Sequence, residues 1–364
     1  MDGEASVFVQ DAAAPRRPEA ERQAALRDPG FGRVFTDHMA TLRYTPDRGW
    51  HDGRIEAAAP LSLHPAAMAL QYAQLVFEGM KAYGLPDGGA ALFRPAENAR
   101  RMQRSAARMG IEPVPEALFL EGVRSLVRAD RDWIPRQEGA SLYLRPFLMG
   151  TDPSFAVRPG RDYMFCVIAS PAAPIFGSTT KPLTLWISDT LTRAAPGGTG
   201  AAKCAGSYGA SLQAVAEAGR EGCDQAIFLD AVERRWIEEL GGMNIMFVFA
   251  DGSLRTPPLG GTILPGVTRD SLLILARDMG LTVREEPYAI DQWQEDARSG
   301  RLTEAFACGT AAVVAPVGQV RGRRHEFAIG GGQAGQVTER LRTALIEIQR
   351  GRAPDPHGWV DRLF

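Results

Sequence analysis

The sequence predicts a two-domain protein of the α+β class. The chain has 364 residues, which is more than one hydrophobic core usually supports. Strand-like and helix-like segments are mixed along both halves, which indicates a mixed sheet in each domain. A stretch rich in turn residues and without periodicity places the domain boundary between them. We therefore expect an N-terminal arm at 1–30, a small α+β domain at 31–170, a linker at 171–182 and a large α+β domain at 183–364.

The first part of the chain predicts an arm followed by a hairpin. Residues 1–30 are rich in Ala, Pro, Arg and Glu and poor in large apolar side chains, so we expect a loosely held segment. Residues 67–77 form an apolar run, helical or partly buried. The segments 81–83 and 91–94 flank turn residues at 86–89, which is typical of a β-hairpin.

A helix and two strands complete the small domain. In the predicted helix over 95–109, Met102, Ala106 and Met109 repeat at helical spacing and form one buried stripe, with Arg101 beside it. Two β-like runs follow, at 141–145 and 162–170.

The first of these runs carries two polar side chains of interest. Tyr143 and Arg145 are two residues apart in the strand and share one of its faces, so both could point at one ligand.

The large domain contains several strands and helices. Strands are expected at 183–188, 225–229, 235–239, 244–249 and 305–317, with turns at 251–252 and 309–310, and helices at 208–218, 269–279 and 336–348.

Composition excludes several classes of function. The formal net charge is −2 and no basic face stands out, so we expect no nucleic-acid partner. No basic-then-apolar leader and no bilayer-length apolar run is present, so we expect a soluble cytoplasmic protein that does not bind a membrane. The four cysteines are widely separated and form no C-x-x-C pair, which argues against disulfides and metal sites and fits a reducing compartment.

Lys203 is the first candidate for chemistry. It lies in the small-residue stretch 193–212, and the whole chain has only three lysines, Lys81, Lys181 and Lys203. Arginine supplies nearly all other positive charge, so a retained lysine can mark a need for an amine that loses its proton and attacks a carbonyl. The alternative is an ordinary solvated lysine in a flexible loop.

Three features could bind one anion. Residues 264–268 end in a threonine before a helix, where free N–H groups attract phosphate, although Thr268 could instead cap its own helix. Residues 308–311 place Thr310 at a turn. Arg101 could supply the charge that a phosphate dianion needs, but it could equally be a solvated surface residue.

Two adjacent carboxylates end a strand at Glu238 and Glu239. One can face solvent and the other inward, where its partner would be a protonated ring nitrogen or an arginine. The amine of Lys203, the phosphate sites, the inward carboxylate and the nearby phenol of Tyr208 together match pyridoxal 5′-phosphate (PLP).

Six ordered motifs carry a family resemblance. Between about Phe31 and Val317 the chain resembles the branched-chain amino acid aminotransferases, which are fold-type IV PLP-dependent enzymes with a D-amino acid aminotransferase-like fold. The motifs are residues 31–39, 70–79, 141–146, 197–203 (Gly-Gly-Thr-Gly-Ala-Ala-Lys), 238–244 (Glu-Glu-Leu-Gly-Gly-Met-Asn) and 264–269 (Leu-Pro-Gly-Val-Thr-Arg).

The resemblance implies roles for the cofactor-binding residues. Lys203 would bind PLP covalently and then move a proton between the substrate Cα and the cofactor, while Glu239 would pair with the ring nitrogen and Tyr208 with the phenolate oxygen. The remaining cofactor contacts would come from Arg101, Leu264, Gly266, Val267, Thr268, Gly309 and Thr310.

The resemblance also implies a substrate site and a partner. The chain would transfer amino groups between leucine, isoleucine or valine and 2-oxoglutarate, as a homodimer, and the linker 171–182 could close over the substrate. Phe35, Tyr72 and Phe77 would line the side-chain pocket and Arg145 would bind the second carboxylate of glutamate. The α-carboxylate would contact Tyr143, Thr310 and Ala311.

The sequence departs from the family in three places. Ala312 and Ala315 stand where some members have a redox-active C-x-x-C, so we expect no thiol switch. Ser207 replaces a common asparagine, and Gly242 a threonine of some members, which leaves substrate preference open. The alternatives are a D-amino acid transaminase, an aminodeoxychorismate lyase, or a non-catalytic protein that binds phosphorylated ligands.

Overall fold

The computed structural model describes residues 7–173 and 181–364. Residues 1–6 of the predicted arm and 174–180 of the predicted linker therefore lie outside the described residues. The chain divides into two compact units. Unit 1 comprises Met1–Ile175, Ala202–Ala205 and Ile348–Phe364, and unit 2 comprises Phe176–Ala201 and Gly206–Glu347.

Unit 1 is built on a mixed sheet with the strand order β1-β3-β2-β8-β7-β5-β6-β18, and β4 pairs with β7. The β1–β3 pair is parallel, and the other pairs are antiparallel. The strands are β1 (Phe8–Gln10), β2 (His38–Thr45), β3 (Gly49–Ala57), β4 (Leu75–Phe77), β5 (Met80–Gly84), β6 (Ala90–Phe93), β7 (Ser141–Gly150), β8 (Tyr163–Ala172) and β18 (Val360–Arg362).

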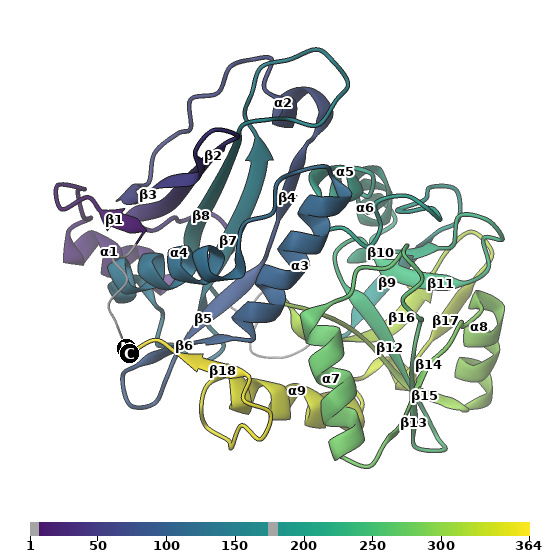
Figure 1. Ribbon diagram of the computed structural model, residues 1–364. Helices are drawn as coiled ribbons and strands as arrows, with labels where there is room; N and C mark the ends of the chain where they lie inside the picture. The colour runs from purple at the N-terminus through teal and green to yellow at the C-terminus, as the bar shows by residue number, and fades with distance from the viewer. Residues whose placement is uncertain (1–6, 174–180) are drawn as a thin grey trace. The chain divides into compact units, whose positions relative to one another are not determined.

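Helices cover one face of this sheet. The helix α4 packs on β1, β2, β3 and β8, and α3 packs on α4 and β4 (Figure 1). In β7, Leu142 and Leu144 are fully buried in the core, so Tyr143 and Arg145 occupy the opposite face of the strand, as predicted. The helices of the unit are α1 (Glu19–Arg27), α2 (Met68–Tyr72), α3 (Pro95–Arg108), α4 (Glu116–Ala129) and the 3₁₀ turn η1 (Arg131–Trp133).

The N-terminal arm is more ordered than its composition predicts. Strand β1 pairs with β3, and the buried Phe8 ring packs against Gly122 of α4. Leu26 of α1 is buried in the same core, so the expectation of a loosely held arm is wrong for 8–10 and 19–27.

Three α-helices of the described residues were absent from the sequence predictions, α1 and α4 in unit 1 and α8 in unit 2. In α4 the buried side chains Phe119, Val123, Leu126 and Val127 follow the i, i+4, i+7, i+8 pattern of an amphipathic helix. The signal was therefore present in the sequence.

A buried ion pair joins β2 to the end of α4. Nδ1 of His38 lies 2.6 Å from Oδ1 of Asp130, and the backbone N–H of His38 donates to Oδ2 at 3.1 Å. The hydrogen bond from Asp130 raises the pKa of His38 above its ordinary 6.5, against the opposing effect of burial. A histidine of raised pKa stabilises the fold below its unfolded pKa and loses that contribution as pH rises through the folded pKa.

We therefore expect stability to fall as pH rises above about 6.5, and Asp130→Asn to remove this dependence. Thermal unfolding midpoints measured from pH 6 to pH 9 would check it. Asp361→Asn, which breaks a half-exposed pair with Arg124 in the same unit, should keep the wild-type pH slope. Equal slopes in wild type and Asp130→Asn would contradict the assignment.

Unit 2 has a second mixed sheet, with the order β11-β10-β9-β16-β15-β12-β13-β14, and β17 pairs with β16. The β9–β10, β9–β16 and β13–β14 pairs are parallel and the others antiparallel, which confirms the prediction of mixed sheets. The strands are β9 (Leu183–Ser188), β10 (Gln225–Leu229), β11 (Ile237–Leu240), β12 (Asn244–Phe249), β13 (Ser253–Thr256), β14 (Thr282–Glu285), β15 (Leu302–Gly309), β16 (Val313–Arg321) and β17 (Glu326–Ala328).

Helices pack on this sheet as well: α6 on β9 and β10, α7 on β14 and β15, and α8 on β15 and β17 (Figure 1). The remaining helices, which lie wholly or mostly in unit 2, are α5 (Ala205–Gly209), α6 (Leu212–Arg220), α7 (Val267–Asp278), α8 (Ile290–Ser299), the 3₁₀ turn η2 (Gly330–Gly332) and α9 (Gln336–Gln349).

Two predicted elements are split in the structure. The expected helix at 208–218 is α5 followed by α6, and the run at 67–77 is α2 followed by β4. In both cases a short turn interrupts a segment that hydrophobicity alone reads as continuous. The predicted turn at 309–310 is present, and it joins the antiparallel strands β15 and β16.

The grouping of residues differs from the predicted domains in two places. Residues 202–205 group with unit 1, as do residues 348–364, whose strand β18 pairs with β6.

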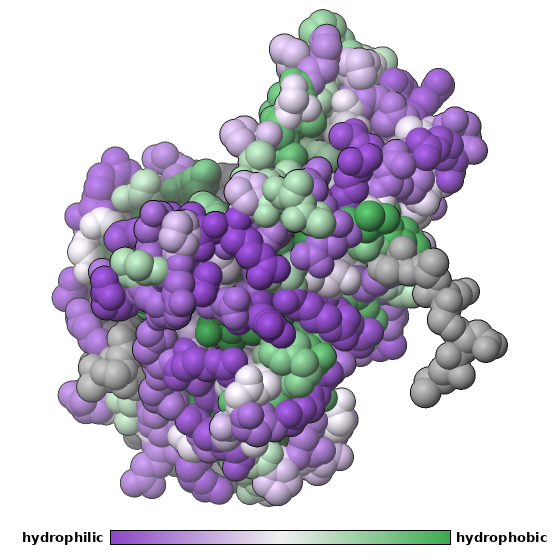
Figure 2. Space-filling model, turned by 90° about the vertical axis from the view of Figure 1, so that its left-hand side faces the viewer, coloured by the Kyte–Doolittle hydropathy of each residue, from purple (hydrophilic) through white to green (hydrophobic). Residues whose placement is uncertain are grey.

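Most of the face drawn in Figure 2 is hydrophilic, with small separate hydrophobic patches. Within 7–173 and 181–364, every helix is too short or too polar to cross a membrane.

Candidate active site

The backbone of Lys203 is fixed to unit 1. Its N–H donates to Oγ of Ser105 on α3 at 2.9 Å, and its carbonyl accepts from the N–H of Phe77 at 2.9 Å. The next residue, Cys204, forms an isolated β-bridge with Val76. This segment lies beside β4 and pairs with it through a single antiparallel bridge, so the alternative of a solvated lysine in a flexible loop is wrong.

The amine of Lys203 lies in a desolvated position. Nζ is 4.8 Å from the centroid of the Phe77 ring. The pKa of Lys203 is lowered to about 8, mainly by burial and then by the nearby Arg101 charge, while Glu78 and Tyr143 act in the opposite direction. A lysine with an ordinary pKa is almost fully protonated near neutral pH. Lowering that pKa makes the neutral, nucleophilic amine accessible.

Arg101 is buried rather than exposed on the surface. It is 4% exposed and forms a two-pronged ion pair with Glu78, which is fully buried. The Nε–H donates to Oε1 of Glu78 at 2.8 Å and Nη2 donates to Oε2 at 2.7 Å. The alternative of a solvated surface arginine is wrong, and Glu78 is a partner that the sequence analysis did not identify.

Tyr143, Arg145 and Phe77 form a second cluster next to the lysine. Nη2 of Arg145 donates to the hydroxyl of Tyr143 at 3.3 Å, and its guanidinium lies 4.8 Å from the centroid of Phe77. Nε of Arg145 is buried and has no hydrogen-bond partner among the described residues. This unpaired donor fits an anionic ligand group, because a buried N–H without a partner is costly.

Gly79 makes room for this cluster. A Cβ at residue 79 would collide with the Tyr143 hydroxyl. The glycine therefore allows the phenol to lie against the backbone.

Two other predicted pocket residues are exposed on unit 1. Tyr72 and Phe35 are 39% and 46% exposed, and the Tyr72 hydroxyl donates to the carbonyl of Phe155 at 2.6 Å. Their place in a substrate pocket stays a prediction.

In unit 2, Glu239 is the centre of a buried polar cluster. Its carboxylate forms an ion pair with Arg193 and accepts hydrogen bonds from the backbone N–H of Leu264 and from Nδ2 of Asn244, both at 2.9 Å. Asn244 also donates to the carbonyl of Leu264 at 3.0 Å. The strand end of β11 and the loop before α7 are thus joined by one carboxylate.

The prediction that one of the two adjacent glutamates faces solvent is wrong. Glu238 is 7% exposed and Glu239 is 3% exposed, so neither faces solvent. Both faces of β11 are covered, and burial raises the pKa of Glu238.

The loop before α7 has the form expected of an anion site. The helix begins at Val267 with Gly266 as its N-cap, and no side chain caps it, so the capping role considered for Thr268 is not observed. A Cβ at Gly266 would collide with Oδ1 of Asn244. The first-turn N–H groups of such a helix attract anions.

The turn between β15 and β16 carries Gly309, Thr310 and Ala311. At its end Val313 has a φ of 62°, a conformation that is strained for a β-branched residue and that is found mainly at functional sites. Burial raises the pKa of Cys308 to about 12, so its thiol is poorly reactive at neutral pH.

Ser207 connects α5 to the Gly-rich loop. Its hydroxyl donates to the carbonyl of Thr199 at 2.9 Å and lies 3.0 Å from Oγ1 of the same residue. This contact fixes the start of the helix that carries the half-buried Tyr208. It gives Ser207 a positioning role that the sequence did not reveal.

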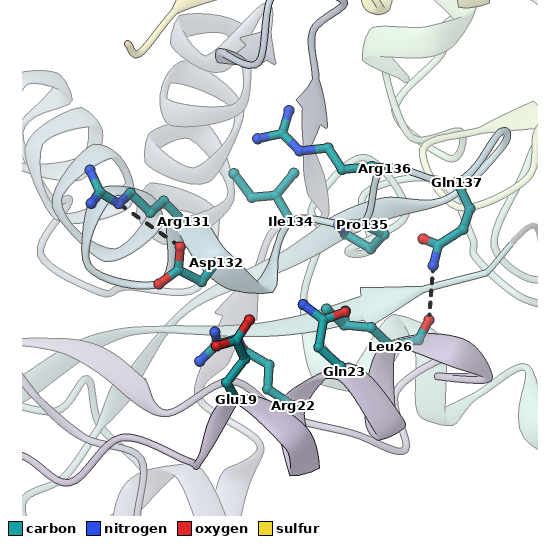
Figure 3. A pocket seen from close by; sticks show the side chains of 10 residues that line it. All are labelled: Glu19, Arg22, Gln23, Leu26, Arg131, Asp132, Ile134, Pro135, Arg136 and Gln137. Atoms are coloured by element: carbon teal, nitrogen blue, oxygen red, sulfur yellow. Dashed lines mark hydrogen bonds and ion pairs between the residues drawn. The ribbon is translucent and has the colours of Figure 1, made fainter.

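A cavity of about 320 Å³ lies in unit 1 between α1 and the segment 134–137 (Figure 3). It is a separate feature, because none of the predicted site residues lines it. Its lining is Glu19, Arg22, Gln23, Leu26, Arg131, Asp132, Ile134, Pro135, Arg136 and Gln137.

Further polar residues position the predicted ones and were absent from the sequence predictions. Glu78 and Asn244 lie inside recognised motifs and Arg193 begins the Gly-rich stretch, so these residues were visible in the sequence, but their pairing with Arg101 and Glu239 was not. Ser105 carried no signal, because its contact depends on how 202–205 folds against α3.

A family model and several relatives match the chain. The model described as amino-transferase class IV matches residues 75–320. A probable branched-chain-amino-acid aminotransferase of Streptomyces coelicolor is 53% identical over 346 residues, covering 95% of both chains. A branched-chain-amino-acid aminotransferase of Mycobacterium tuberculosis is 51% identical over 349 residues, again covering 95% of both.

Solved structures agree with the sequence matches. The branched-chain amino acid aminotransferase of Escherichia coli is 29% identical with a TM-score of 0.76, covering 90% of this chain and 99% of the other. The branched-chain amino acid aminotransferase of Thermobaculum terrenum, in its PLP-bound holo form, is 25% identical with a TM-score of 0.73, covering 90% and 98%. This chain therefore belongs to the class IV aminotransferases, within the branched-chain-amino-acid aminotransferase family.

Proposed function

We propose that this protein is a transaminase that transfers the amino group of L-leucine, L-isoleucine or L-valine to 2-oxoglutarate, with PLP as its cofactor. The observation that carries the proposal is the desolvated amine of Lys203, whose pKa is lowered to about 8. It shares unit 1 with Arg145, whose buried Nε has no hydrogen-bond partner among the described residues.

PLP fits the donor set of these residues. A nucleophilic amine, a buried arginine, a helix N-terminus and a buried carboxylate match its aldehyde, its phosphate and its ring nitrogen. When bound, PLP supplies the aldehyde that takes up the amino group and a ring that holds the negative charge developing at the substrate Cα.

Lys203 has two tasks in the proposal. Its neutral amine, which the lowered pKa makes available, would hold the aldehyde carbon of PLP. With substrate bound, the same amine would take the proton from the substrate Cα as a general base. The bonds of the Lys203 backbone to Ser105 and Phe77 hold the amine in place for both steps.

The other cofactor contacts remain assignments from the family. Glu239 is proposed to pair with the ring nitrogen and Tyr208 with the phenolate oxygen, and Leu264 to pack on the ring. The phosphate is assigned to Arg101, Gly266, Val267, Thr268, Gly309 and Thr310. The buried state of Arg101, Glu239 and Thr268 supports these assignments, because water then competes less for the same bonds.

The Tyr143–Arg145 strand supports the proposed dual specificity. Arg145 is proposed to bind the second carboxylate of glutamate or 2-oxoglutarate, while Phe77, with Tyr72 and Phe35, accepts an aliphatic side chain. Tyr143 and the turn at Thr310 and Ala311 are proposed to hold the α-carboxylate. The guanidinium lies over the Phe77 ring, so charged and apolar surfaces adjoin at one place.

The activity is tested by incubating the purified protein with L-leucine and 2-oxoglutarate and measuring glutamate. We expect glutamate from leucine, isoleucine and valine and none from D-leucine, which separates this function from a D-amino acid transaminase. The absence of glutamate with every aliphatic L-amino acid would refute the proposal.

We also propose a homodimer in the cytoplasm. The side chains of Leu70, Phe155 and Val157 are 59%, 77% and 88% exposed, and large exposed apolar groups often mark an interface. All four cysteines are free thiols, which fits a reducing compartment. Light scattering of the wild type and of Phe155→Ser would test the dimer, whose mass should fall toward 39.4 kDa in the variant.

A further inference from the structure

Hydrogen bonds hold both carboxylate oxygens of Glu78 in its ion pair with Arg101. Oε1 binds Nε of Arg101, and Oε2 accepts from Nη2 of Arg101, from Nδ2 of Asn98 at 2.8 Å and from the N–H of Gly79 at 3.2 Å. The backbone N–H of Glu78 donates to the carbonyl of Pro146 at 2.7 Å. The carboxylate therefore cannot rotate without losing several hydrogen bonds at once.

Stability alone is a poor reason for such a pair. Replacing a buried ion pair by apolar residues of similar volume is often neutral or stabilising, whereas removing one partner is costly. Leu or Met at these two positions would come close to filling the same space. What an apolar replacement cannot do is hold a guanidinium in one orientation.

The geometry leaves one side of Arg101 directed away from Glu78. A guanidinium has five N–H groups in a rigid plane, and two of them point at the carboxylate. The other three, on Nη1 and on the outer side of Nη2, face the opposite edge. A fork of this kind matches the oxygens of a phosphate.

We propose that Glu78 is a positioning residue that orients Arg101, so that the guanidinium edge turned away from Glu78 binds the phosphate of PLP. The inference rests on the proposed function, which assigns Arg101 to that phosphate. Asn98 and Gly79 take part by holding Glu78.

Glu78 has two opposite effects on phosphate binding, one through its charge and one through the orientation of Arg101. The negative charge of Glu78 lies close to Arg101 and by Coulomb's law weakens the attraction of the site for a phosphate dianion. If charge were its main effect, removing it would strengthen phosphate binding. If orientation is its main effect, removing it weakens phosphate binding.

The experiment compares two ligands that differ only in the phosphate. Full-length protein is equilibrated by dialysis with PLP or with pyridoxal, and the two dissociation constants are measured from bound ligand. Both ligands carry the aldehyde for Lys203, so any change at the lysine cancels in the ratio of pyridoxal Kd to PLP Kd. The variants are Glu78→Gln, Asn98→Ala and Arg101→Met, with Asp130→Asn as a control that removes another buried carboxylate of unit 1.

We expect Glu78→Gln to lower this ratio at least tenfold, Asn98→Ala to lower it by a smaller factor, and Asp130→Asn to leave it within twofold. A ratio that is unchanged or increased in Glu78→Gln would overturn the inference. If Glu78→Gln does not fold, an unchanged ratio in Asn98→Ala would do the same. If Arg101→Met itself leaves the ratio unchanged, the phosphate assignment in the proposed function fails instead.

Discussion

Replacing Lys203 by alanine is expected to lower the transamination rate by more than about 10⁴-fold, because one side chain supplies both the nucleophile and the general base. Glutamate formed from L-leucine and 2-oxoglutarate measures the loss. Added PLP should not restore activity, since the missing group belongs to the protein.

The small number of lysines gives this prediction a direct chemical control. Reduction of the PLP-loaded protein with borohydride should leave a phosphopyridoxyl group on Lys203 alone among three lysines, as mapped by peptide mass. Lys81→Met is the matched variant, because Lys81 is also buried in unit 1 and desolvation lowers its pKa to about 7. A label on Lys81, or full activity of Lys203→Ala, would contradict the assignment.

Arg145→Met is expected to separate the two half-reactions. A charge-assisted hydrogen bond contributes roughly 1.5–3 kcal/mol, so kcat/KM for 2-oxoglutarate should fall about 10- to 150-fold. The half-reaction with L-leucine should change less than about threefold, because methionine keeps the apolar contact with Phe77. Stopped-flow absorbance of each half-reaction would check both values.

The control for Arg145 is another arginine of unit 1. Arg124 pairs with Asp361 on β18, and Arg124→Met should leave both half-reactions near the wild-type rate. Equal losses with leucine and 2-oxoglutarate in Arg145→Met would show that Arg145 supports the fold of β7 rather than recognising the second carboxylate.

Elements with strong periodicity or clear turns could be predicted from sequence. The strands at 183–188, 225–229 and 244–249 match β9, β10 and β12, and the helix expected at 95–109 is α3 within one residue at its end. In these segments local pattern and tertiary burial agree. The prediction of a loosely held arm was wrong for the opposite reason. The contact of Phe8 with α4 joins segments that are far apart in the sequence, so local pattern does not reveal it.

Only those residues of the candidate site whose own type or spacing along the chain indicates a role could be predicted from the sequence. Lysine scarcity identified Lys203, and the period of two placed Tyr143 and Arg145 on one face. The partners that tune these groups come from distant segments: Glu78 lies 23 residues from Arg101 and Ser105 lies 98 residues from Lys203. Such pairings depend on how segments pack, and one sequence carries no record of them.

The most direct test of the account follows the visible absorbance of the PLP-loaded protein through one cycle. L-leucine alone should bleach the band of the lysine-bound cofactor, and 2-oxoglutarate should then restore it with one glutamate released per site. D-leucine and the Lys203→Ala variant should show no such cycle. A wild-type spectrum that L-leucine, L-isoleucine and L-valine all leave unchanged would contradict the assignment of this chain as a branched-chain transaminase.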